Sequence, residues 1–171
     1  MKHAQLLERL DRAWQAFLAS YAGLPEARLT EPGVAGDWSV KDVIAHVTTW
    51  EEEALAHLPT ILAGGAPPRY AAQYGGLDAF NALTAARWRD RPLADALRRQ
   101  DEIHRRLIEF IQQAPDDQIA TETRFRRRLR LDTYGHYPLH TAMIWAWREE
   151  PAAKECASNE KPSAQPSGSQ I

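Results

Sequence analysis

The segment DTYGHYPLH at residues 132–140 carries two histidines, His136 and His140, four positions apart. Side chains four apart on an α-helix project from the same face, with roughly 5–6 Å between their Cβ atoms. Two neutral imidazoles at this spacing can supply two of the three or four ligands that a zinc-type ion needs. The segment therefore predicts a helix that carries part of a metal site, and the rest of the fold has to bring a third ligand to it.

Two poor helix formers, Gly135 and Pro138, lie inside the same segment. Pro138 lacks the backbone N–H that would otherwise bond the carbonyl of Tyr134. The apolar periodicity places the last helix from near Asp132 through Trp147. Because of Pro138, we expect this helix to be kinked or to begin late.

His46 is the leading candidate for the third ligand. It lies in a predicted helix that runs from Val40 towards His57, between the apolar residues Val43 and Trp50. A histidine on an apolar helix face has to be neutral and either hydrogen-bonded or ligated, because burying an unpaired charged imidazole is costly. We therefore expect His46 to point towards the core.

Further amphipathic stretches predict the remaining helices, which lie at Leu6–Tyr21, 77–89 and 93–111. Ser39 and Asp42 form a capping-box start for the helix that carries His46. Glycines and prolines at 64–68 interrupt the chain after it. The pattern predicts an all-α four-helix bundle with a long, broken crossover between the second and third helices.

Length and composition predict one bundle domain at residues 1–150, followed by a disordered tail at 151–171 that is rich in Pro, Ala and Ser. The tail holds the single cysteine, Cys156. The formal net charge of -2 argues against nucleic acid or an anionic membrane as a partner and favours a small molecule. Without a visible signal peptide or apolar span, the expected location is cytoplasmic.

Each candidate site has a plainer interpretation. A lone His46 is more often a hydrogen-bonded core residue than a ligand, and a pair of histidines four apart can arise by chance. The basic cluster from Arg124 to Arg130 can hold a carboxylate-bearing cofactor thiol at the pocket mouth, with Arg126 and Arg128 as the contacts. Such a run is more often a solvated connection paired with surface acids, and we favour that interpretation.

The segments at 36–47 and 133–140 together resemble signature motifs of the DinB-like, or YfiT-like, superfamily of four-helix-bundle proteins. The first looks like its helix 2 motif and the second like its helix 4 motif. The region of Asn81 and the kinked third helix also look like the branch of ClbS- and DfsB-like proteins. The resemblance implies that the three metal ligands fall on His46, His136 and His140 and that the ion is zinc or nickel.

The same resemblance implies several activities, because the superfamily includes bacillithiol and mycothiol S-transferases, a maleylpyruvate isomerase, a cyclopropane-opening hydrolase and proteins without known activity. We expect a metal-dependent enzyme that attacks a small electrophile with a metal-bound thiolate or hydroxide. Glu53, seven residues after His46, is the candidate base or orienting group. The alternative is a non-catalytic stress-associated or self-resistance binding protein with structural histidines. A homodimer is a further possibility in either case.

Overall fold

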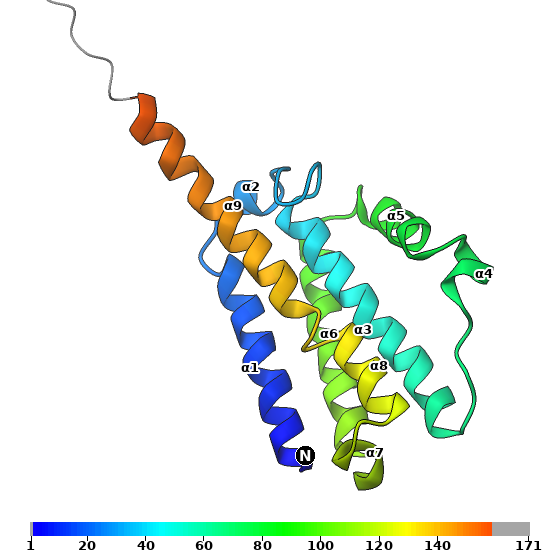
Figure 1. The fold of residues 1–171 in the computed structure, drawn as a ribbon. Coiled ribbons are helices and arrows are strands. Elements are labelled where there is room, and N and C mark those ends of the chain that lie inside the picture. The colour runs from blue at the N-terminus through cyan, green and yellow to red at the C-terminus, as the bar shows by residue number, and fades with distance from the viewer. Residues whose placement is uncertain (1, 159–171) are drawn as a thin grey trace, which may run out of the picture.

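The computed structural model describes residues 2–158, and four helical rods lie side by side in it (Figure 1). Three rods are single helices, namely α1 (His3–Tyr21), α3 (Val40–Leu62) and α6 (Leu93–Gln112). The fourth rod consists of two helices in succession, α8 (Arg124–Asp132) and α9 (Tyr137–Ser158). Short helices lie in the connections, namely α2 (Glu26–Leu29) and α7 (Asp116–Ala120). The predicted all-α four-helix bundle is confirmed.

The crossover between α3 and α6 runs along the outside of the bundle and contains α4 (Tyr70–Tyr74) and α5 (Leu77–Trp88) (Figure 1). Its main anchor is Phe80, which is buried and packs edge-on against Trp50 of α3 with 5.4 Å between ring centroids. The predicted long, broken crossover is therefore confirmed, and it forms an outer layer over one side of α3.

Helix α3 begins with the predicted capping box. The Ser39 hydroxyl accepts from the backbone N–H of Asp42 at 3.2 Å, and the Asp42 carboxylate accepts from the backbone N–H of Ser39 at 2.8 Å. These two bonds satisfy N–H groups that a helix start leaves without intrahelical partners. They fix where α3 begins and therefore which of its residues face inward, His46 among them.

The fourth rod is broken between Asp132 and Tyr137. The backbone N–H of Gly135 donates to the carbonyl of Arg130 at 2.9 Å, a reach of five residues that ends α8. Helix α9 then starts at Tyr137 rather than near Asp132, so Pro138 lies in its first turn, where its missing N–H costs no intrahelical bond. The expectation of a late-starting helix is confirmed.

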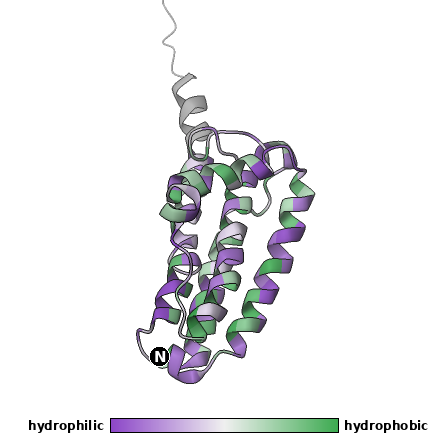
Figure 2. Cartoon of the chain, turned by 90° about the vertical axis from the view of Figure 1, so that its right-hand side faces the viewer, coloured by the Kyte–Doolittle hydropathy of each residue, from purple (hydrophilic) through white to green (hydrophobic). Residues whose placement is uncertain are grey.

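Two apolar clusters fill the bundle, one on each side of a buried polar level. Figure 2 shows hydrophobic and hydrophilic residues alternating along the rods. One cluster includes Phe17, Val43 and Ile144, and the other includes Leu58 and Phe125. Between them lie polar side chains that are almost fully buried, namely Glu51 and Gln100.

The basic stretch forms helix α8, whereas we favoured a solvated connection paired with surface acids. The reason is an inward-facing stripe of Phe125 and Leu129, both fully buried, beneath the arginines. The pairing itself is present, because Arg126 and Arg130 lie 3.4 and 2.8 Å from Glu122.

Helix α9 continues to Ser158, beyond the predicted domain end at residue 150, and the rest of the predicted tail, 159–171, lies outside the described residues. No described helix is long and apolar enough to cross a membrane.

We predict that Gly135→Ala destabilises the fold. An added Cβ at Gly135 would lie 2.7 Å from the carbonyl oxygen of Arg130, so the backbone has to shift, at a cost of about 1–3 kcal/mol. Urea unfolding measures the loss. Gly23→Ala is the comparison variant. Its positive φ of 75° strains an alanine but the space around it is open, so it gives the cost of backbone strain without steric crowding. Wild-type stability in Gly135→Ala would contradict the proposed close approach.

Candidate metal centre

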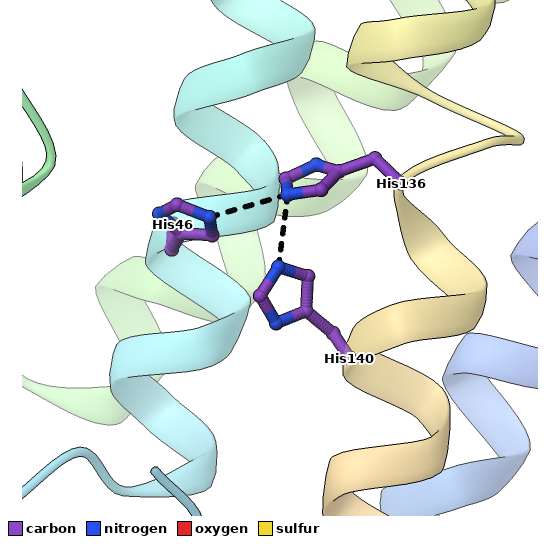
Figure 3. A group of neighbouring side chains, drawn as sticks. All are labelled: His46, His136 and His140. Atoms are coloured by element: carbon purple, nitrogen blue, oxygen red, sulfur yellow. Dashed lines mark hydrogen bonds between the residues drawn. The ribbon is translucent and has the colours of Figure 1, made fainter. Parts of the chain in front are cut away.

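Three histidines from two rods meet at the break in the fourth rod (Figure 3). His46 comes from α3, His136 lies directly before α9, and His140 lies in its first turns. The Nε2 atom of His136 lies 3.3 Å from that of His46 and 2.9 Å from that of His140. One ligand nitrogen from each ring therefore lies within 4.8 Å of the others, as the sequence predicted for this set.

The spacing of the nitrogens fits a divalent ion better than it fits hydrogen bonding. Zinc binds imidazole nitrogen at about 2.0–2.1 Å, and a tetrahedral arrangement at that radius separates the nitrogens by roughly 3.3 Å. The Nε2 atom of a neutral imidazole carries either one N–H or one lone pair, so the Nε2 atom of His136 can hydrogen-bond only one of the two nitrogens that face it. A cation between them removes this conflict. The three residues therefore fit a zinc or nickel ion.

Burial keeps the three rings neutral. Burial lowers the pKa of His46 and of His136 to about 3, with the neighbouring histidines adding to the effect. It also lowers the pKa of His140 to about 4. At neutral pH the nitrogen lone pairs are therefore free to coordinate a metal, which protonated imidazoles cannot do.

The other nitrogen of each ring has no partner in the described part of the chain. The Nδ1 atoms of His46, His136 and His140 are all buried without a hydrogen bond there. Metal-ligating histidines usually donate this N–H to a carboxylate or carbonyl, which fixes the orientation of the ring. Here the placement of the rings depends on the packing of α3 and α9 and on neighbouring aromatic rings such as Trp50.

A cavity of about 390 Å³ opens next to the histidines. Its wall is formed by residues of the rods and of the crossover between α3 and α6. The lining residues are His46, Trp50, Tyr70, Leu77, Asn81, Arg128, Leu131, Asp132 and His136. A larger hollow of about 620 Å³ at the start of α3 contains no histidine in its lining. The smaller cavity therefore gives a small molecule access to His46 and His136.

The cavity wall contains a network of polar side chains centred on Arg128. The Arg128 guanidinium donates to Asp132 at 2.5 Å and to the Tyr70 hydroxyl at 2.7 Å, and Tyr70 donates to Glu53 at 2.5 Å. Burial raises the pKa of Asp132 to about 7, and the Arg128 charge opposes part of this rise. The wall therefore holds a carboxyl group that can exchange a proton near neutral pH.

The remaining predicted site residues lie at different distances from the cavity. Arg128 lines it, whereas Arg126 is 3.4 Å from Glu122 and is not part of the lining. Glu53 is also outside the lining and reaches it only through the Tyr70 hydroxyl. Of these residues, Arg128 is thus the one placed to touch a bound molecule.

Sequence reasoning missed Tyr70 and Asp132 as cavity residues. Tyr70 lies in the crossover, where no periodic pattern indicates which side chains point inward. Asp132 offered a usable signal, because it lies four residues before His136. That spacing would place it on the ligand face of a continuous helix.

Fold and site together define an all-helical bundle protein with a candidate three-histidine metal centre. The family described as the mycothiol maleylpyruvate isomerase N-terminal domain matches residues 10–147, and the chain belongs to this family. The resemblance to the DinB-like superfamily is thereby confirmed. No curated protein matches the sequence.

Solved structures of low sequence identity share the fold. The chain is similar to DfsB, described as a sibling lethal factor precursor, with a TM-score of 0.72 and 14% identity over 88% of this chain and 97% of that one. It is similar to the colibactin self-resistance protein ClbS, with a TM-score of 0.70 and 15% identity over 84% and 93%. It is also similar to a protein from Streptococcus pneumoniae, with a TM-score of 0.71 and 11% identity over 87% of this chain and 91% of that one.

The comparison with ClbS corrects one expectation. That protein was solved in complex with double-stranded DNA, so the exclusion of nucleic acid from the net charge was wrong. Net charge sums over the whole chain, whereas phosphate contacts depend on where the basic side chains lie. A net charge of -2 is therefore compatible with a basic surface.

We predict that the protein binds one zinc or nickel ion per chain through the three histidines. His46→Ala, His136→Ala and His140→Ala should each lower affinity by more than the 10–100-fold that is typical of losing an outer-shell partner. Elemental analysis and chelator competition measure stoichiometry and affinity. His57→Ala is the matched control, because His57 lies on α3 but pairs with Glu53, 3.6 Å away. Equal metal content in all four variants and wild type would contradict the site.

Proposed function

We propose that this chain is a metal-dependent enzyme that joins a low-molecular-weight thiol to a small electrophile. His46, His136 and His140 would hold one zinc or nickel ion. The observation that carries the proposal is the convergence of three neutral imidazole nitrogens beside a cavity of about 390 Å³. Three neutral ligands leave a divalent ion its full charge and at least one open position, as in catalytic sites.

The cavity walls suit a small, partly apolar molecule. Trp50, Leu77 and Leu131 supply apolar surface in the space next to the histidines. A bound zinc-type ion would deprotonate a coordinated thiol or lower the pKa of water towards neutrality. Asp132 lies in the same wall, and its carboxylate can take up the proton that the thiol would release on coordination. The thiolate sulfur would then bond to the electrophile, whose leaving group departs with the electron pair of the broken bond.

Arg128 is the proposed contact for an acidic group on the thiol. A guanidinium has five N–H donors, and the bonds to Asp132 and Tyr70 use two of them. The remaining donors keep the forked geometry that suits a carboxylate. Tyr70, held by Glu53, fixes the plane of the guanidinium, which gives Glu53 an indirect orienting role.

Thiol transfer is favoured over hydrolysis because the matched family is named for a mycothiol-dependent isomerase. That name belongs to the family as a whole, so the thiol used by this chain is part of the proposal. Hydrolysis through water at the same site is the runner-up. A non-catalytic binding protein with structural histidines is the alternative, and it needs no turnover.

We predict that the zinc- or nickel-loaded protein accelerates conjugation of bacillithiol or mycothiol to a chlorobimane electrophile. The double variant His136→Ala, His140→Ala should fall to the uncatalysed rate, because two of the three nitrogens are lost. Fluorescence of the conjugate measures the rate, and His57→Ala is the control. If no thiol is conjugated, the transferase proposal fails, and ring-opening of an epoxide or cyclopropane by the loaded protein then tests hydrolysis.

We also predict that Arg128→Met weakens thiol binding more than it slows turnover. It should raise KM for the acidic thiol by about tenfold, the effect of losing one charge-assisted hydrogen bond of roughly 1.5 kcal/mol. Arg124→Met is the control, because Arg124 is an exposed α8 arginine that donates to the Gly65 carbonyl at 2.8 Å. An unchanged KM in Arg128→Met would remove Arg128 from the binding site.

A further inference from the structure

We infer that Tyr137 and Glu51 form the contact that positions His136 and His140 against His46. Tyr137 is the first residue of α9 and directly follows His136. Its hydroxyl donates to Oε1 of Glu51, which lies on α3 five residues after His46. The inference rests on the proposed metal site and names the residues that set its geometry.

The histidines need such a contact because their own rings are not tied down. Their Nδ1 atoms have no hydrogen-bond partner in the described residues, so no outer-shell bond sets the ring orientation directly. The position of each ring therefore depends on its backbone and on the aromatic rings packed around it. His136 lies in the break before α9, where α8 has ended and no regular helix holds it.

The Tyr137–Glu51 hydrogen bond lies directly next to the backbone that carries His136. The Tyr137 and Glu51 side chains are both fully buried, at 0% exposure, so their hydrogen bond does not compete with solvent. It joins the first turn of α9 to the rod that carries His46. A displacement of α9 relative to α3 would move His136 and His140 together while leaving His46 in place.

Glu51 is also held from α6, and α1 packs against that second contact. His104 of α6 lies with its Nδ1 atom 2.8 Å from the same Glu51 oxygen. Trp14 of α1 stacks on the His104 ring, with 3.7 Å between centroids and 3° between planes. All four rods therefore meet at one buried polar contact, in the level that separates the two apolar clusters.

The Tyr137 hydrogen bond also stabilises the fold, so the experiment has to separate metal affinity from stability. Tyr137→Phe removes only the hydroxyl. Tyr21→Phe is the matched control, because Tyr21 is a buried tyrosine that donates to Gln100 at 2.9 Å and contacts none of the three histidines. Both variants lose one buried phenol bond, but only Tyr137 connects α9 to α3.

The experiment measures zinc affinity by chelator competition, the visible absorption of the cobalt-substituted protein, and thermal stability for each variant. We expect Tyr137→Phe to lower zinc affinity by about 10–100-fold and to change the cobalt spectrum, because both report ligand positions. Tyr21→Phe should bind zinc within about twofold of wild type even when it loses as much stability.

Glu51→Gln tests whether the contact acts through geometry. Its amide oxygen can still accept from Tyr137, so we expect near wild-type affinity. The inference is overturned if Tyr137→Phe binds zinc as wild type does, if Tyr21→Phe loses equal affinity, or if Glu51→Gln loses as much as Tyr137→Phe. If the wild-type protein binds no zinc, both the proposed function and this inference fail. If every variant binds zinc as tightly as wild type, only this inference fails.

Discussion

The break in the fourth rod is the constraint on which the candidate site depends. A continuous helix would carry its hydrogen bonds through residues 133–136 and would have to accommodate Pro138 in its interior, at a cost of about 3 kcal/mol. The close approach of Gly135 to the Arg130 carbonyl ends α8 instead, and Pro138 falls where α9 starts. The chain can then pack α8 against α3 and α9 against α1 within a single rod.

The buried polar side chains between the two apolar clusters lower the stability of the fold unless they find hydrogen-bond partners. Glu51 has two hydrogen-bond partners, but burial still raises its pKa above the ordinary range, against the effect of His104 and Tyr137. The three facing imidazole nitrogens cannot all satisfy one another, because the Nε2 atom of His136 can hydrogen-bond only one of the other two. A metal ion would satisfy them and stabilise the fold by mass action, so stability and the candidate function are linked at this level.

The sequence predicted the rods because each has a stripe of apolar residues that only a helix can bury on one side. It predicted the three histidines because two share a helical spacing and the third lies among apolar neighbours. It did not predict α8, because five arginines within 124–130 conceal the Phe125 and Leu129 stripe. Nor did it predict Tyr70, whose inward direction is set by tertiary bonds to Glu53 and Arg128 rather than by local pattern.

The four rods and the outer crossover contribute different residues to the cavity. The rods hold the histidines and the Glu51–Tyr137 contact, all of which depend on helix positions. The crossover contributes Tyr70, Leu77 and Asn81 to the opposite wall through short helices with few buried residues. Changes in the crossover can therefore alter which molecule fits without moving the ligand nitrogens. Substitutions in the crossover are expected to change the shape of the cavity more than the positions of the histidines.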